Sequence, residues 1–306
     1  MADAAAAIWG AYVGDAASLG FHWLYDPDRL RALVGTSAAF RPPNPADFEG
    51  ARGIFVHHSK MNGDLSHYGM QLQVMHRALL DAGDYDRGAY QAAFAAAFGP
   101  GGSWRGYIDK ATKGTLAGIA AERQPSGADD DQLPAISKLP ALMVALRGRA
   151  DAADVAMDAV EVTSANDTAR AWAPAAIAAL ARVLDGGSLH DGLMAGIAAS
   201  SGEVALALRQ AMAAAERDPV EFAGEVGRAC PLPQAMPVIY QVLARAHDYP
   251  QAIEETIRAA GDNCGRAVFV GAMAGAAFGR TAIPLAWSLR LRGGAALWED
   301  CQTLAS

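Results

Sequence analysis

The sequence predicts an all-α fold, a single orthogonal bundle of many helices that spans residues 1–306. Alanine-rich segments follow one another along the chain, and each carries the apolar period of a helix. No segment shows the sustained alternation of apolar and polar residues that is typical of a half-buried strand. Clusters of Gly and Pro, such as Gly99-Pro100-Gly101-Gly102 and Gly186-Gly187, separate the segments because a helix cannot continue through them. We expect these clusters to connect helices within one domain.

The individual helices are predicted from apolar runs that end at such breaks or begin after a capping residue. The longest irregular stretch, residues 35–63, contains Pro42, Pro43 and Pro45, which keep it extended, and long loops of this kind are often functional. In chain order, the expected helices cover residues 3–19, 64–82, 84–98, 104–121, 132–148, 151–164, 168–185, 188–198, 201–216, 234–247, 250–260, 265–279 and 295–304.

Two of these helices carry glycine stripes. Gly10 and Gly14 lie one turn apart, as do Gly271, Gly275 and Gly279. A stripe without side chains allows another backbone to approach closely. We therefore expect both helices to be tightly packed, with the polar residues next to the stripes deep between packed elements.

Composition and charge exclude several classes of protein. A chain of 306 residues that is 52% hydrophobic can bury a large core. Its net charge of −8 disfavours direct nucleic acid binding, which needs clustered Lys and Arg. Three dispersed cysteines are typical of neither a disulfide framework nor a zinc site, and they favour the reducing cytoplasm. The longest uncharged apolar run, residues 267–279, falls short of the ~20 residues of a membrane helix, and no basic residue precedes the apolar N-terminus as in a signal peptide.

Two boxes near the chain ends resemble a known family. The segment GAYVGDAASLG, Gly10–Gly20, resembles the first box of the ADP-ribosylglycohydrolase family. The segment GDNCGRAVFVGAMAGAAFG, Gly261–Gly279, resembles its last box, together with Ile283-Pro284 and Trp287 downstream. The two boxes occur in the family's order and span nearly the whole chain. The resemblance implies an all-helical fold and a site at which both boxes meet.

The resemblance also implies a metal site, which this sequence alters. Active members of the family hold two Mg²⁺ ions between a Thr-Asp-Asp-Thr motif and an Asp-x-Asp-Thr motif. In the second motif Asp262 matches the first carboxylate, but Cys264 and Gly265 stand at the positions of the second Asp and the Thr. Magnesium takes oxygen ligands, and a thiol is a poor substitute. The last box is therefore remodelled.

The first metal motif is altered as well. The chain reads NGDLSHYGMQLQVM over residues 62–75, without paired Asp residues. If residues 68–71 are aligned with the Thr-Asp-Asp-Thr motif, Met70 stands at the position of an acid and only Gln71 offers an oxygen. A shifted alignment lets Asp64 supply one carboxylate. We expect Mg²⁺ to be held weakly by Asp262 and Asp64, or to be absent. The pattern resembles the branch of the family that contains the jellyfish J-type crystallins and selenoprotein J.

Cys264 has two interpretations. It precedes a helix that begins near Gly265, and both the helix N-terminus and Arg266 would lower its thiol pKa and make it a reactive thiolate. Alternatively, it is a buried thiol that packs as a small hydrophobe. Asp262 and Asn263 are open to two roles as well, because their side chains can cap the same helix. Cys230 and Cys301 are assigned to packing.

Other side chains are candidates for the same cleft. Asp15, in the first box, is a catalytic candidate or a structural hydrogen-bonding group. Two interpretations are open for Asp129, Asp130 and Asp131: one of them turns into the cleft, or all three only reflect the preference of carboxylates for a helix N-terminus. Trp104 and Tyr107, near Arg105 and Lys110, could stack an adenine and meet a phosphate. His22, His57 and His58 are expected to face solvent or to stack. The residues expected to bind substrate are Asp64, His67, Tyr68, Gln71, Asn263 and Arg266.

Two functional hypotheses follow. The first is an ADP-ribosylglycohydrolase-like hydrolase that cleaves a ribosyl glycosidic bond in a small-molecule or ADP-ribosylated substrate, with Asp262, Cys264 and Asp15 as catalytic residues and an altered dependence on Mg²⁺. The second is a descendant without hydrolase activity: a crystallin-like or ligand-binding protein, or a thiol-dependent protein that uses Cys264. Loss of the paired carboxylates supports the second hypothesis. The sequence contains no dinucleotide, P-loop or serine-hydrolase motif.

Overall fold

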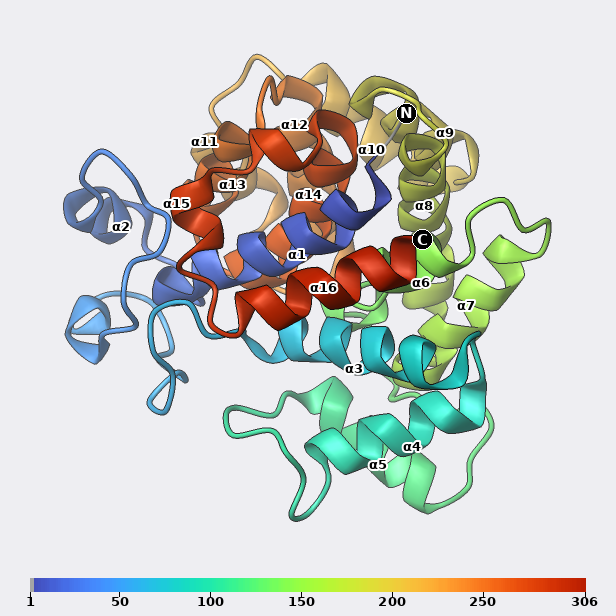
Figure 1. Ribbon diagram of the computed structural model, residues 1–306. Helices are drawn as coiled ribbons and strands as arrows, with labels where there is room; N and C mark the ends of the chain where they lie inside the picture. The colour runs from blue at the N-terminus through green and yellow to red at the C-terminus, as the bar shows by residue number, and fades with distance from the viewer. Residues whose placement is uncertain (1–2) are drawn as a thin grey trace.

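The predicted fold class is confirmed. A computed structural model of the chain describes residues 3–306, and this part forms 16 α-helices and short 3-10 turns, with isolated β-bridges but no sheet (Figure 1). The helices are α1 (Ala4–Ser18), α2 (Pro27–Leu33), α3 (His67–Ala82), α4 (Arg87–Phe98), α5 (Lys110–Ala120), α6 (Leu139–Ala145), α7 (Ala152–Thr163), α8 (Asp167–Leu184), α9 (Leu189–Ala198), α10 (Gly202–Ala213), α11 (Pro219–Val226), α12 (Leu232–Arg245), α13 (Tyr249–Arg258), α14 (Asn263–Phe278), α15 (Leu285–Ser288) and α16 (Gly294–Ala305).

Most predicted helices agree with these bounds to within a few residues, but two were drawn too long. The helix expected over residues 104–121 begins only at Lys110, after Asp109 has capped it by accepting the amide N–H of Thr112 at 2.6 Å. The helix expected over residues 132–148 is a 3-10 turn followed by the short α6, because two prolines interrupt it.

Three short helices were missed by the sequence argument, namely α2, α11 and the four-residue α15. Both α2 and α11 begin with a proline that directly follows an aspartate cap, Asp26 or Asp218. At the first position of a helix, a proline removes only an N–H that has no partner there, so this Asp-Pro pattern is a helix start that the sequence argument did not use.

The glycine stripes lie against each other, as backbone contact between α1 and α14. A Cβ atom added to Gly271 would lie 2.2 Å from the carbonyl oxygen of Gly10, and one added to Gly275 would lie 2.1 Å from that of Ala6. Figure 1 shows α1 in the middle of the bundle, between α14 and α16. Because both helices are buried along almost their whole length, the residues at their ends lie inside the molecule.

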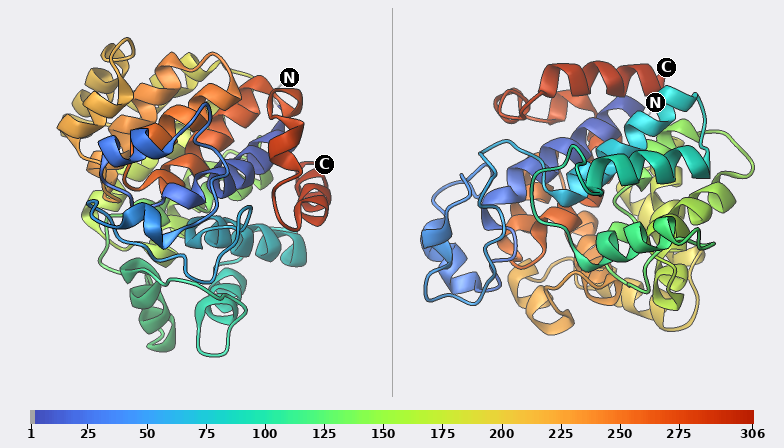
Figure 2. Two further views of the ribbon diagram at one scale, coloured as in Figure 1. Left: turned by 90° about the vertical axis from the view of Figure 1, so that its left-hand side faces the viewer. Right: turned by 90° about the horizontal axis from the view of Figure 1, so that it is seen from below.

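A backbone bridge joins the segments that follow α1 and precede α14. The N–H of Trp23 donates to the carbonyl of Gly261 at 2.9 Å, and the N–H of Gly261 donates to Leu24 at 2.7 Å. Ala260 and Gly261 both have positive φ, which produces the sharp turn into α14. Figure 2 shows α2 and the irregular segment after it lying over the outside of the bundle. The bridge places His22 beside Asp262.

None of the helices described in residues 3–306 combines the length and the apolar character needed to cross a membrane.

Candidate active site

A buried chain of three side chains runs from the start of α14 to the irregular segment. Asp262 Oδ1 lies 2.9 Å from Nε2 of His22, and Nδ1 of His22 lies 2.7 Å from Nε2 of His57. Asp262 and His22 have no exposed surface, and His57 is 3% exposed. The expectation that His22 and His57 face solvent is therefore wrong, whereas their rings do stack, with centroids 4.9 Å apart. Of the neighbouring histidines, only His58 is exposed.

The protonation states of His22 and His57 follow from the ionisation of Asp262. Burial alone would raise the pKa of Asp262, but hydrogen bonds from His22 and Tyr68 lower it to about 2, so the carboxylate only accepts. Burial lowers the pKa of both His22 and His57, which are neutral at pH 7. Nε2 of His22 must then donate to Asp262, and its Nδ1 must accept from Nε2 of His57. These hydrogen bonds therefore leave a free lone pair on Nδ1 of His57, an atom that has no hydrogen-bond partner within residues 3–306.

The first turn of α3 completes the surroundings of Asp262. The hydroxyl of Tyr68 donates to Asp262 Oδ2 at 2.7 Å, and Tyr68 is fully buried. Asp262 also caps α14, because its Oδ1 accepts the amide N–H of Gly265 at 3.4 Å. The capping role that the sequence argument gave as one alternative for Asp262 is therefore confirmed, and the same carboxylate also accepts from His22 and Tyr68.

Asp15 lies at the same end of α3 and binds Ser66, the cap of that helix. Its carboxylate accepts the amide N–H of Ser66 at 2.7 Å and the hydroxyl of Ser66 at 2.5 Å. Burial raises the pKa of Asp15 to about 6, against the opposing effect of these hydrogen bonds. A Cβ atom on Gly69 would lie 2.2 Å from Asp15 Oδ2, so the absence of a side chain at Gly69 makes room for this carboxylate.

Asp15 gives a testable dependence of stability on pH. Because its pKa is about 6 in the folded state and 3.8 ordinarily, the folded state binds the proton first, and this contribution to the free energy of unfolding rises as the pH falls from about 6 to about 4. In urea titrations, the stability of the wild type relative to Asp15→Asn should increase by about 2 kcal/mol from pH ~7 to pH ~4. The exposed control Asp167→Asn should show no such trend, and a flat difference for Asp15→Asn would contradict the assignment.

His67 and Gln71 face the start of α5 rather than Asp262. Nε2 of His67 lies 3.2 Å from Oδ2 of Asp109, although neither atom makes a well-directed hydrogen bond. Burial would raise the pKa of Asp109, but His67 and Thr112 together hold it below its usual value. The side-chain amide of Gln71 donates to the hydroxyl of Thr112 at 3.2 Å. The sequence argument did not single out Asp109. Its position just before a helical segment is typical of a helix cap and gives no further indication of a site.

Aromatic rings cover this polar network. The rings of Trp23 and Tyr107 meet edge to face with centroids 5.0 Å apart, and each lies within 6 Å of the His67 ring. Tyr107 is partly exposed, whereas Trp23 is 7% exposed. The network is therefore closed off from bulk solvent, which strengthens every charge interaction within it.

The expected low pKa of Cys264 is wrong. The thiol has no exposed surface, and burial, reinforced by Asp15 and Asp262, raises its pKa well above the ordinary value. The helix N-terminus and Arg266 do not compensate for this. Sγ lies 3.7 Å from the backbone carbonyl of Asp15, as expected for a packed thiol with a weak hydrogen bond.

Arg266 and Asn263 are buried too. The guanidinium of Arg266 donates to the carbonyl oxygens of Arg228, Thr256 and Ala260, so in this structure it holds the turn before α14. Asn263 has no partner for either side-chain amide atom among the described residues, which leaves it able to bind a water molecule or a ligand.

Asp64 is not brought to Asp262. Its carboxylate pairs with Arg292 at 2.9 Å and accepts the amide N–H of Met61 at 2.8 Å, and the two aspartates share no partner in the described chain. Of the three acids after Gly127, Asp130 is buried and Asp129 is exposed. Burial raises the pKa of Asp130 to about 6, so it is the one that turns inward.

The residues present do not fit a pair of magnesium ions. Both carboxylate oxygens of Asp262 and both of Asp15 already accept hydrogen bonds from protein donors. Within residues 3–306, no group of three His, Cys, Asp or Glu side chains is placed to hold a metal ion. What the geometry offers is an ionised aspartate, a fixed histidine pair and a buried lone pair on Nδ1 of His57 that has no partner among the described residues.

In this fold of packed helices, the segment after α1 and the segment before α14 meet at the buried carboxylate of Asp262. This arrangement defines the class of the protein. The sequence model of the family described as ADP-ribosylglycohydrolase matches residues 2–306, and the chain belongs to this family. Crystallin J1A of Tripedalia cystophora is 25% identical over 334 residues, which cover 99% of this chain and 96% of the crystallin. Crystallin J1B of the same organism is 25% identical over 308 residues, covering 95% and 92%.

A solved structure shares the fold. A chain of an "ADP-ribosylglycohydrolase-related protein complex" aligns with a TM-score of 0.69 and 17% identity, covering 99% of this chain and 98% of that one. The family is typically metal-dependent, so the donor arrangement found here departs from it. The resemblance to the J-type crystallins that the altered metal motifs predicted is confirmed by both crystallin relatives.

Proposed function

We propose that this protein is a metal-independent hydrolase of a ribosyl glycosidic bond in a small-molecule or ADP-ribosylated substrate. The observation that carries this proposal is the buried chain of Asp262, His22 and His57, which occupies the meeting point of the two family boxes and ends in a free lone pair. The family membership supports the bond type. Neither Asp64 nor a magnesium ion has a part in the reaction.

In the proposed step, His57 acts as a general base. Nδ1 of His57 takes a proton from a water molecule, and the water oxygen forms a bond to the anomeric carbon. The glycosidic bond breaks, its electron pair stays on the leaving atom, and that atom takes up a proton from solvent. The ionised Asp262 stabilises the positive charge that the proton brings to the histidine pair.

The test compares neighbouring histidines. Release of ADP-ribose from an ADP-ribosylated peptide is measured with and without EDTA for the wild type, His57→Gln and His58→Gln. EDTA should leave the rate unchanged, His57→Gln should lower kcat by about 100-fold or more, and the exposed His58→Gln should stay within about twofold. Because burial lowers the pKa of His57, the wild-type rate should fall only at a pH below the ordinary histidine range.

Two other outcomes would each point elsewhere. Activity that EDTA abolishes and Mg²⁺ restores would show a metal mechanism and reject the proposal. The second candidate is a crystallin-like protein without catalysis, favoured by the complete burial of His22, Tyr68 and Asp262. Absence of release, together with no shift of the melting temperature by ADP-ribose, would support that candidate, because a ligand of the native state must stabilise it.

A further inference from the structure

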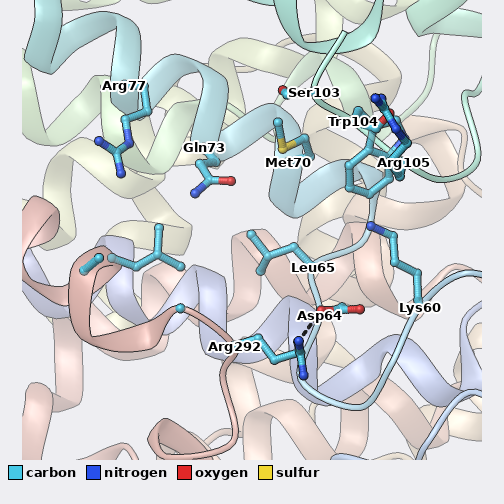
Figure 3. Close-up of a pocket in the computed structure, with 13 residues that line it drawn as sticks. Lys60, Asp64, Leu65, Met70, Gln73, Arg77, Ser103, Trp104, Arg105 and Arg292 are labelled. Carbon is cyan, nitrogen blue, oxygen red and sulfur yellow. Dashed lines mark hydrogen bonds and ion pairs between the residues drawn. The ribbon is translucent and has the colours of Figure 1, made fainter. Parts of the chain in front are cut away.

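A separate cavity of about 530 Å³ opens on the other side of the first turns of α3. It lies between α3, the start of α16 and the loops around Lys60 and Trp104, as Figure 3 shows. None of the residues in the buried network described above lines it. The proposed hydrolysis therefore makes no use of this cavity.

The cavity is positively charged in a negatively charged protein. The chain has a net charge of −8, yet the lining contains four cationic side chains and one carboxylate, that of Asp64. The cations come from four separate segments, and in Figure 3 they lie on different sides of the opening rather than along one edge. The cationic residues are Lys60, Arg77, Arg105 and Arg292.

Two of these cations are paired but still exposed. Arg292 lies 2.9 Å from Asp64, and Arg77 lies 2.9 Å from Asp300. About half of each arginine side chain remains accessible, at 53% and 52%. A guanidinium has five N–H donors, so each arginine retains donors for a second acceptor.

The other two cations face neutral groups. The Lys60 ammonium lies over the Trp104 ring, 3.5 Å from its centroid, and Arg105 donates to the carbonyl oxygens of Gly102 and Trp104. Among the described residues, neither of these two cations forms an ion pair with a carboxylate. Gln73 and Ser103 add neutral donors to the lining.

We propose that this cavity binds a small molecule that carries adjoining phosphate groups, with Lys60, Arg105 and Arg292 contacting its oxygens. Several positive donors converge on one open cavity, and guanidinium groups match the geometry of phosphate oxygens. The spread of the cations favours a diphosphate over a single phosphate, because one phosphate cannot reach all sides of the cavity. Nucleic acid is disfavoured by the net charge of the chain.

The experiment titrates inorganic pyrophosphate into the full chain and follows binding by calorimetry and by tryptophan fluorescence, since Lys60 lies on Trp104. We expect pyrophosphate to bind with a Kd below about 1 mM and more tightly than orthophosphate. Arg105→Gln should weaken binding several-fold, and Lys60→Met combined with Arg105→Gln should weaken it by about tenfold or more. Added salt should weaken binding by the wild type.

Matched controls separate this site from general charge and from the hydrolase proposal. Arg209→Gln removes an exposed arginine of α10 and should leave the Kd within about twofold of the wild type. His57→Gln should bind pyrophosphate as the wild type does, whatever its effect on hydrolysis. Equal binding by the wild type and Arg105→Gln, or no binding at about 10 mM pyrophosphate, would overturn the proposal.

Discussion

Gly271→Ala should destabilise the protein by about 3 kcal/mol or more, because the new methyl group would lie 2.2 Å from the backbone oxygen of Gly10. Neither helix backbone can move aside without separating α1 from α14 along their contact. The gain in helix propensity, about 1 kcal/mol, is too small to compensate. The measurement is urea unfolding followed by far-UV circular dichroism.

A glycine outside this contact is the control for that substitution. Gly88 is exposed in the first turn of α4, and a Cβ atom there would meet only the Asp86 side chain, at 3.3 Å. Gly88→Ala should leave stability unchanged within about 1 kcal/mol or increase it slightly. Similar effects of the two substitutions would show that the stripe is not in close backbone contact.

Asp262→Asn should lower kcat/KM for hydrolysis by a factor of about 10³ or more. The amide oxygen of the asparagine can still accept from Nε2 of His22 and from the N–H of Gly265, while its NH2 group faces the Tyr68 hydroxyl, so the hydrogen bonds between the side chains are kept. The substitution removes the negative charge that stabilises the protonated histidine pair.

Nitrogen NMR of the histidine side chains tests this loss of charge directly. Nδ1 of His57 should be unprotonated at pH ~7 in both the wild type and Asp262→Asn, and the pKa of the histidine pair should be lower in Asp262→Asn, an effect that a loss of stability alone would not produce. The exposed control Asp167→Asn should match the wild type in both rate and spectrum. An unchanged pKa of the histidine pair, or unchanged kcat/KM, would contradict the proposed role of Asp262.

Helix positions and family membership could be predicted because they depend on local pattern. The apolar period and the Gly and Pro breaks placed most helices, and the two boxes indicated the ADP-ribosylglycohydrolase family that the match over residues 2–306 confirms. The stripes at Gly10 and Gly271 predicted close backbone packing. The omission of α2 and α11 has one local cause, because an aspartate cap followed by proline was not used as a helix start.

The chemistry of the site depended on contacts between distant segments. His22 lies 35 residues from His57 and 240 residues from Asp262 in the sequence, so no local pattern could show that the three side chains form one chain. The same holds for Cys264, whose neighbours along the helix predict a low pKa while burial by packed elements raises it. Local sequence decides where a helix begins and ends, but desolvation is a property of the whole packed interior, and here it decides which groups are charged and which atom is left to accept a proton.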